Sequence, residues 1–407
     1  MNHRIESGTN LAIHTMIRLI WKYGSLTRAE LSRYSGFSRS TVSVNVDRLL
    51  SLRVLKERKI NGPNDEAGKR TRLTLNPDRG IFVGIELDAG HCDIGFCDIQ
   101  GKLLTGVSML INYEIGPDLI MEQIIAAIKS MQHTYETRNV TILGIGVGLP
   151  TPVDFDEGFA VHPAFMPGWH RYPIKSRLQK IFDVPVYVDN EVNTMGLGEA
   201  HLSTRFRESN LLFVKLGLGI GAGLVIGGEC YRGNSGLSGN IGHIRINSRK
   251  DPCKCGKVGC LEAIAGGWGL IRQAESLIGN PKCPTLTNAF ERKGHLNIED
   301  LIESVERLEK PVLDIVHEAA KVIGPSLGRA VQFFDPKAVV FGGILCSFGP
   351  QFIDLIRLGI IREATPWIKS DFEISLSKVG DSIGMVGSAM LCISTLIQNN
   401  QIIQDGA

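Results

Sequence analysis

The residues best suited to chemistry are one histidine and three cysteines that lie within eighteen positions of the chain. They are His243, Cys253, Cys255 and Cys260. Zn²⁺ takes four nitrogen and sulfur ligands in a tetrahedron, and these side chains complete that set with no position left for water. The spacing therefore predicts a structural Zn²⁺ site. The alternative is a cysteine-rich turn that holds ordinary thiols or a disulfide.

Two glycines in the same segment favour the metal site. Gly256 and Gly259 lie between the second and third cysteines, and a loop that folds three sulfur atoms onto one ion needs positive φ, which glycine adopts at little steric cost. The other six cysteines are scattered and mostly flanked by apolar residues, so we expect buried free thiols. Thiols arranged for a metal favour a reducing cytoplasm.

Length and composition indicate a globular protein of two or three domains. The chain has 407 residues, of which 43% are hydrophobic and 21% are charged, and this is ordinary usage for a soluble protein with a large core. The sequence contains no uninterrupted apolar run of 18 residues and no apolar leader segment. We therefore expect a cytoplasmic protein without membrane insertion.

Charge is unevenly distributed along the chain. Residues 1–80 carry 15 of the 44 basic and 7 of the 42 acidic side chains, a net charge of +8, which leaves the remainder with 29 basic and 35 acidic, a net charge of −6. A small basic unit joined to a larger acidic one is typical of a nucleic-acid-binding head on a body with another task. A basic solvated surface without a nucleic-acid partner is the alternative.

The head has the pattern of a helix-turn-helix. A first helix is predicted by an apolar stripe, and a second begins at Thr27 with Glu30 placed to complete a capping box. A turn at residues 35–37 precedes a third helix from Ser38 to about Leu52, which should bury one apolar face and expose its polar N-terminal end. The stripe of the first helix is Ile13, Met16, Ile17, Ile20 and Trp21.

Two short strand-like runs follow, at residues 54–60 and 71–75, around a polar tip at 61–69. This is the pattern of a wing, so residues 1–76 are predicted to form a winged helix-turn-helix domain. Short polar side chains and Arg in the first turns of a recognition helix can reach base edges, and basic side chains of a wing suit phosphates. The DNA-binding candidates are Arg39, Ser40, Ser43, Asn45, Lys69 and Arg70. A trihelical module that never contacts DNA is the alternative.

After a linker at residues 77–80 the pattern changes to α/β. Residues 81–87 and 91–99 predict a strand hairpin, which a helix over 119–131 and a buried strand over 142–147 follow. A second hairpin, at 211–216 and 221–228, surrounds a glycine-rich turn and repeats the first in outline. The repetition indicates two similar lobes that enclose a cleft.

Several motifs of this body resemble one family. They are Gly148 to Asp154, Pro167-Gly168-Trp169, Asp189 to Asn193 with Gly198-Glu199, Gly219 to Gly223, Gly239 to His243 with the cysteine cluster, and Asp335-Pro336 with Phe341-Gly342-Gly343. In this order they are similar to the ROK family of repressors and sugar kinases, and the added head resembles its repressor branch of xylose-, N-acetylglucosamine- and glucose-responsive regulators.

The resemblance implies an α/β, actin- and hexokinase-like (ribonuclease-H-like) body of two lobes with sugar bound between them. We expect the N-terminal lobe over residues 81–200, the C-terminal lobe with the zinc knuckle over 201–384, and a C-terminal helix over 385–407 that returns to the N-terminal lobe. The family's sugar contacts correspond to Asn190, Glu191, Asn240, His243 and Glu262. His243 is expected to bind zinc through one ring nitrogen and to face a sugar hydroxyl with the other.

Departures from the family's kinases argue against phosphoryl transfer. Glu191 occupies the place of the catalytic aspartate and is expected to be a vestigial base, since one extra methylene displaces the carboxylate. In the two phosphate-binding turns, Asp88 adds a negative charge and Leu218 replaces a threonine. Asn240 replaces a glutamate, and Phe165 an asparagine, around the sugar. We therefore expect no catalytic residues and no enzyme activity.

The sequence thus predicts a sugar-responsive transcriptional regulator, with operator DNA and a sugar effector as partners and Zn²⁺ as its structural cofactor. A homodimer or a dimer of dimers is expected to present two heads to DNA half-sites, and the regulator is expected to act as a repressor of carbohydrate-utilisation genes. One alternative is an ATP-dependent sugar kinase that carries a DNA-binding head. Another is a regulator controlled by a protein partner.

Overall fold

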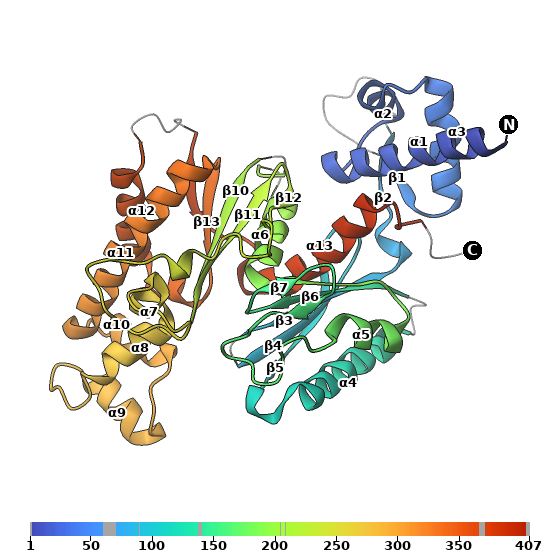
Figure 1. The fold of residues 1–407 in the computed structure, drawn as a ribbon. Helices are drawn as coiled ribbons and strands as arrows, with labels where there is room; N and C mark the ends of the chain where they lie inside the picture. The colour runs from blue at the N-terminus through green and yellow to red at the C-terminus, as the bar shows by residue number, and fades with distance from the viewer. Residues whose placement is uncertain are drawn as a thin grey trace.

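The chain folds into a small head and two larger lobes (Figure 1). The computed structural model describes residues 2–59, 71–88, 90–136, 141–203, 205–207, 209–365 and 371–403. The head lies next to the N-terminal lobe, and the C-terminal lobe lies farthest from it.

The head is a winged helix-turn-helix, as predicted. Thr27 caps the second helix in a capping box with Glu30, and Gly36 ends that helix in the left-handed conformation, with φ at 73°. Ser38 caps the third helix by accepting a hydrogen bond from the Thr41 backbone NH. The elements are α1 (Asn2–Tyr23), α2 (Arg28–Ser35), α3 (Arg39–Ser51), and the antiparallel strands β1 (Leu55–Lys59) and β2 (Thr71–Leu75).

The N-terminal lobe is a five-stranded sheet in the order β5-β4-β3-β6-β9. β5, β4 and β3 pair antiparallel, and β3, β6 and β9 pair parallel. The strands are β3 (Ile81–Leu87), β4 (His91–Cys97), β5 (Leu103–Leu110), β6 (Ile142–Leu149) and β9 (Val186–Asn190). The helices of this part of the chain are α4 (Pro117–Glu136), α5 (Ile174–Phe182) and α6 (Glu191–Leu202), and β7 (Val153–Asp154) pairs with β8 (Phe159–Ala160).

The C-terminal lobe repeats this topology. Its sheet has the order β12-β11-β10-β13-β14, again with two antiparallel pairings followed by two parallel ones. The duplicated sheet confirms the prediction of two similar lobes. The strands are β10 (Leu211–Leu216), β11 (Ile220–Ile226), β12 (Glu229–Cys230), β13 (Ala338–Gly342) and β14 (Glu373–Leu376); the helices are α7 (Leu261–Ala265), α8 (Gly267–Glu275), α9 (Pro284–Lys293), α10 (Ile298–Glu306), α11 (Lys310–Phe334) and α12 (Pro350–Glu363).

The last helix, α13 (Ile383–Gln398), packs against α6, β3 and β6, beneath the head (Figure 1). Glycines permit its close approach, because a Cβ at Gly84 would lie 1.8 Å from the Met385 carbonyl oxygen and a Cβ at Gly146 would lie 1.7 Å from that of Ser388. The segment Gly380–Gln398 is long and apolar enough to cross a membrane by length and composition alone, but 78% of an 18-residue stretch of it is buried inside the protein. It is therefore placed as a core helix.

The end of the chain fastens the head to the body. Arg18 of α1 donates hydrogen bonds to the Gln398 carbonyl and, at 3.2 Å, to Asn400 Oδ1. Arg79 donates to the Ile402 carbonyl, and Gln100 Nε2 donates to the Leu75 carbonyl at 2.9 Å. Residues of α1, β2, β3 and α13 share one hydrophobic cluster. The head is thus packed onto the body through side chains as well as through the linker.

Candidate functional site

A cavity of about 570 Å³ lies between the two lobes and brings together all five predicted sugar-contacting residues. Its volume is within the range of small-molecule sites. The N-terminal lobe contributes the ends of β3, β6 and β9 and the start of α6, and the C-terminal lobe contributes the β10–β11 turn and the metal-site segment. The predicted residues that line it are Asn190, Glu191, Asn240, His243 and Glu262.

The four predicted metal ligands also converge. The ligand atoms of His243, Cys253, Cys255 and Cys260 all lie within 4.8 Å of one another. Cys253 Sγ is 3.6 Å from His243 Nδ1, and Cys255 Sγ is 3.7 Å from Cys260 Sγ. A tetrahedron with metal–sulfur bonds of about 2.3 Å has edges of roughly 3.8 Å, so the cluster has the size and the donor set to hold one metal ion.

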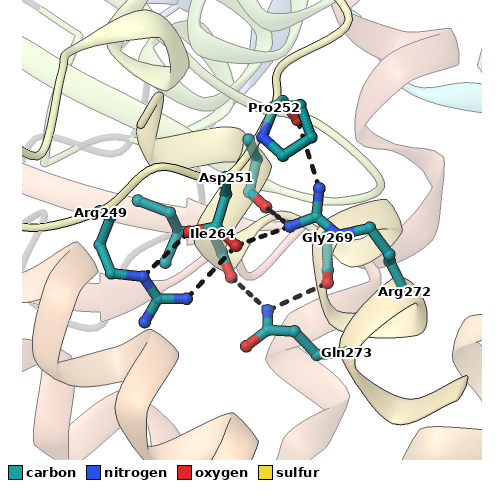
Figure 2. Close-up of polar contacts among 8 residues, drawn as sticks. Arg249, Asp251, Pro252, Ile264, Gly269, Arg272 and Gln273 are labelled. Atoms are coloured by element: carbon teal, nitrogen blue, oxygen red, sulfur yellow. Dashed lines mark hydrogen bonds and ion pairs between the residues drawn. The ribbon is translucent and has the colours of Figure 1, made fainter. Parts of the chain in front are cut away.

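Helix α8 supports the cysteine segment. Arg272 donates to Asp251 Oδ1 at 2.7 Å and to the Pro252 carbonyl at 3.3 Å, and Arg249 donates to the other oxygen of Asp251 at 2.9 Å (Figure 2). Gly256 and Gly259 have φ values of 87° and 74°, which confirms the conformations predicted for them. Two arginines and one carboxylate therefore hold the backbone that precedes the first cysteine.

His243 and Glu262 connect this cluster to the cavity. His243 presents Nδ1 to Cys253, which leaves Nε2 for a ligand, and the residue lines the cavity. Glu262 follows Cys260 by two positions and is 8% exposed. Its Oε2 accepts from the Ile220 backbone NH at 3.1 Å and its Oε1 accepts from Trp268 Nε1 at 3.3 Å. The carboxylate is therefore held in one orientation, and both its oxygens keep lone pairs for a ligand.

Asn190 and Glu191 lie where β9 ends and α6 begins. Asn190 Oδ1 caps α6 by accepting from the Val192 backbone NH at 3.0 Å, while its Nδ2 donates to the Thr151 carbonyl at 2.9 Å. These bonds fix the amide beside the cavity. Asn240 lies across the cavity on the C-terminal lobe and is exposed. The two amides thus approach the cavity from opposite lobes.

A buried lysine in the cavity was missed by the sequence analysis. Lys215 of β10 is 6% exposed, and its Nζ lies 2.8 Å from Asp88 Oδ2 and 2.7 Å from Glu191 Oε2. Burial alone would lower the pKa of Lys215, but the neighbouring carboxylates Asp88, Glu191 and Glu86 raise it well above its usual range. An ammonium ion from the C-terminal lobe therefore bridges two carboxylates from the N-terminal lobe.

Glu86 completes this charge cluster and is protonated near neutral pH. Burial raises the pKa of Glu86 to about 8, with Lys215 opposing the rise and Glu191 and Asp88 adding to it. Burial also raises the pKa of Glu191, against the effect of Lys215. Three carboxyl groups share one lysine, so a proton on Glu86 reduces the buried negative charge.

The second glycine-rich turn packs closely against Glu262. A Cβ at Gly219 would lie 2.7 Å from Glu262 Oε2, and the Gly217 carbonyl accepts from the Gly267 backbone NH at 2.9 Å. Leu218 lines the cavity with an apolar side chain. The absence of a side chain at Gly219 therefore leaves room for the Glu262 carboxylate.

The predicted DNA-binding residues differ in how exposed their side chains are. Arg39 and Ser40 are exposed on the first turn of α3 and Ser43 is partly buried. Asn45 was expected near the exposed end of this helix, but it is only 5% exposed, because it lies beside the buried stripe of α3, and its Nδ2 donates to the Thr41 carbonyl at 2.8 Å. We therefore exclude Asn45 from base contacts. Lys69 and Arg70 lie outside the described residues.

These observations define a class of protein, namely an actin- and hexokinase-like body with a cleft between duplicated lobes and a winged helix-turn-helix head. Residues 83–395 match the ROK family, and the chain belongs to that family. The expectation from the sequence motifs is thereby confirmed, as is the predicted fold class.

Both regulators and kinases are among the proteins similar to this chain. A putative xylose repressor from Caldicellulosiruptor sp. is 26% identical over 97% of this chain and 98% of its own length. A glucokinase from Halalkalibacterium halodurans is 27% identical over 76% of this chain and 94% of its own length. A crystal structure of a ROK family transcriptional regulator, described as a homologue of the E. coli MLC protein, has a TM-score of 0.80 at 21% identity and covers 97% of this chain. The regulators extend over the head, whereas the kinase corresponds in length to the body.

Proposed function

We propose that this protein is a sugar-responsive transcriptional regulator that represses carbohydrate-utilisation genes in the cytoplasm. Its partners are operator DNA, through α3 and the wing, and a sugar effector in the interlobe cavity. The similarity to a putative xylose repressor over nearly the whole of both chains supports this function. The contacts that join the cavity to the head carry the proposal.

Helix α6 makes that connection. Its first residue, Glu191, lines the cavity, and its last turn contains His201, whose ring lies 4.9 Å from the ring of Trp21 in the head. The ten residue steps between Glu191 and His201 span roughly 15 Å of helix. Arg207 strengthens the junction, because its Nη2 donates to the His201 carbonyl at 2.8 Å and its Nη1 lies against Gly24 of the head. A displacement of α6 when sugar binds would therefore move the surface on which the head is packed.

The buried lysine supports regulation over catalysis. A base that takes a proton from a sugar hydroxyl must have a free carboxylate, but Glu191 is paired with Lys215 at 2.7 Å. Asp88, from the first turn, adds negative charge where phosphates would approach, and Leu218 offers no donor at the second turn. The Lys215 ammonium group of the C-terminal lobe already pairs with Asp88 and Glu191 of the N-terminal lobe at this position.

Zn²⁺ is the ion that the four-ligand cluster fits best, because Cys₃His sites are tetrahedral and closed to water. When bound, it would fix the orientation of the His243 ring and the position of Glu262 at the edge of the cavity. The metal thus has a structural role at the sugar site.

The proposed response of DNA binding to sugar requires a coupling energy of ordinary size between the two sites. A hundredfold change in operator occupancy requires that the sugar favour one state of the protein by about 2.7 kcal/mol. In a homodimer or a dimer of dimers, a change in lobe closure would alter the separation of two heads on half-sites about one helical turn apart.

A mobility-shift titration on the DNA upstream of the protein's own gene tests the proposal. Glucose, N-acetylglucosamine, xylose and allose would be titrated separately, and at least one is expected to change the affinity for DNA. If none binds by calorimetry while DNA binding is intact, the sugar-responsive function is wrong and control by a protein partner is favoured.

A sugar kinase is the second candidate function. Two observations support it: the Glu191 carboxylate lines the cavity, and the body is similar to a glucokinase. A coupled assay for ADP release with the same sugars separates the two functions. Turnover that disappears in Glu191→Ala would establish the kinase and contradict our proposal.

A further inference from the structure

An ion pair other than that of Lys215 also joins the two lobes. Arg232 of the C-terminal lobe follows β12 by two positions, and its Nε donates to Asp189 Oδ2 at 2.7 Å. The Asp189 side chain is only 4% exposed. Its other oxygen, Oδ1, accepts from the Asn190 backbone NH at 2.7 Å and from Asn193 Nδ2 at 2.9 Å. One carboxylate therefore holds the end of β9 to the start of α6 and to the opposite lobe.

This ion pair lies close in sequence to two of the proposed sugar-contacting residues, one from each lobe. Asn190 follows Asp189 directly, and Asn240 follows Arg232 by eight positions. Residues 236–240 line the cavity, whereas neither Arg232 nor Asp189 is among the residues that line it. A sugar that draws Asn190 and Asn240 together would therefore act on this ion pair without competing with it.

The guanidinium group of Arg232 also leads towards the C-terminal segment. Its central carbon lies 3.8 Å from the centre of the Phe155 ring, and that ring stacks on the ring of Tyr187 with 6.3 Å between centres and an interplanar angle of 16°. The Tyr187 hydroxyl donates to Gln401 Oε1 at 3.0 Å. Gln401 directly follows the residues to which Arg18 of the head is hydrogen-bonded. A continuous series of contacts thus extends from the ion pair to the segment that holds the head.

The chemistry of arginine suits the start of this series. A planar guanidinium group can pair with a carboxylate and lie over an aromatic ring at the same time. Because Arg232 belongs to the C-terminal lobe while Phe155 and Tyr187 belong to the N-terminal lobe, any change in lobe closure displaces the guanidinium group relative to both rings. Packed side chains and hydrogen bonds of this kind can carry coupling between distant sites.

We propose that Arg232 is a positioning residue, which couples closure of the lobes on the sugar to the C-terminal segment that holds the head. The inference rests on the proposed function. It adds to the connection through α6 a second connection, which begins at the ion pair beside the cavity and ends at residues 398–401.

Two substitutions interrupt the series at different contacts. Arg232→Met removes the ion pair, whereas Tyr187→Phe keeps the stacked ring and removes the hydroxyl that bonds to Gln401. Fluorescence anisotropy with labelled operator, with and without saturating glucose, N-acetylglucosamine, xylose or allose, measures the change in DNA affinity that sugar causes. In Tyr187→Phe this change should be about two- to tenfold smaller than in the unmodified protein, from the loss of one hydrogen bond. The reduction in Arg232→Met should be at least as large, and Arg232→Lys, which retains a cation, should recover part of the response.

Arg205→Met is the matched control. Arg205 also pairs with a carboxylate, that of Glu373, and lies over an aromatic ring, that of Phe206, but it belongs neither to the cavity nor to this series of contacts. Its substitution should leave the sugar response unchanged. Calorimetry on the DNA-free protein separates coupling from binding, because Tyr187→Phe should keep its sugar affinity within about twofold of that of the unmodified protein. A purely structural role of Arg232 would lower thermal stability in Arg232→Met and leave the sugar response of Tyr187→Phe intact.

A full sugar response in either Arg232→Met or Tyr187→Phe would overturn this assignment alone, and so would an equal loss of response in Arg205→Met. If Arg232→Met does not fold, Tyr187→Phe decides, since it leaves the partner of Asp189 in place. Failure of the unmodified protein to respond to any of the four sugars would overturn the proposed function and this assignment together.

Discussion

Trp21 of the DNA-binding head and His201 of α6 are in tilted ring contact, with an interplanar angle of 41°. Burial, with the positive charge of Arg207 beside it, lowers the pKa of His201 to about 4, so the ring is neutral at physiological pH. This contact joins the helix that begins in the cavity to the first helix of the head.

Loss of the ring contact should uncouple the head from the sugar. In Trp21→Ala, DNA affinity and sugar affinity should each persist, while the change in DNA affinity that sugar causes should fall by about tenfold, which corresponds to a coupling energy of about 1.4 kcal/mol. Fluorescence anisotropy with labelled operator, with and without sugar, measures this. Trp21→Phe keeps an aromatic ring and is the control. A full sugar response in Trp21→Ala would exclude this route of coupling.

Loss of one thiolate should release the metal. Cys255→Ser is expected to lower the bound metal from one equivalent towards zero and to weaken sugar binding, because His243 and Glu262 lose the support of the same cluster. Elemental analysis and calorimetry measure the two effects. Cys346→Ser, outside the cluster, should change neither. Normal sugar affinity in a metal-free Cys255→Ser protein would show that the metal does not support the sugar site.

Removal of the buried ammonium should be strongly destabilising. Lys215→Met leaves Glu191 buried without its partner, and breaking a buried ion pair on one side costs about 3–5 kcal/mol. The free energy of unfolding in urea should therefore fall by that amount. Adding Glu191→Gln removes the unpaired charge and should restore part of the stability. If the double variant is no more stable than Lys215→Met, the two residues do not act as a pair.

The raised pKa of Glu86 predicts a loss of stability as pH rises from acid towards about 8. The pKa of Glu86 is raised to about 8 in the folded protein, above its value in the unfolded chain. The folded state thus holds a proton that the unfolded state has released, and stability should fall as pH rises from about 4.5 through 8. Thermal unfolding across this range measures the slope. Glu86→Gln should reduce it, and an identical slope in that variant would contradict the assignment.

Substitution of Arg39 should weaken DNA binding without changing sugar binding. Arg39→Ala is expected to weaken operator binding by about 1–3 kcal/mol if the guanidinium contacts a base, with sugar affinity unchanged. Asn45→Ala should instead lower thermal stability, because Asn45 is buried. Mobility shift, calorimetry and thermal unfolding on both variants test this division. Simultaneous loss of DNA and sugar binding in Arg39→Ala would refute the modular arrangement.

Local signals in the sequence were sufficient to predict the fold of the head and the proximity of the metal-site cysteines. The capping box of Thr27 and Glu30 depends on residues three positions apart, and the cysteines lie in one short segment, so spacing alone predicts their proximity. The prediction that Asn45 is exposed is wrong because Val42 and Leu49, three and four positions away, belong to the buried stripe of α3 and Asn45 lies on the same face.

Relationships between distant segments could not be derived from spacing. Lys215 joins Asp88 and Glu191 across two lobes, and nothing local to any of these residues indicates the others. A weak signal did exist, since Lys215 is the only charged residue in the otherwise apolar strand Leu211–Leu216. The contact of Trp21 with His201 had no such signal, because both residues appear as ordinary members of helices.

The bonds from Arg18 and Arg79 to the last described residues have a consequence for biosynthesis. These contacts join partners separated by 380 and 323 residues. Domains fold as units while the ribosome extends the chain from the N-terminus, so the winged helix can acquire its own core early in translation. Its orientation on the body must wait until residues 398–402 have left the ribosome, so the head can be fixed in place only after both lobes have been synthesised.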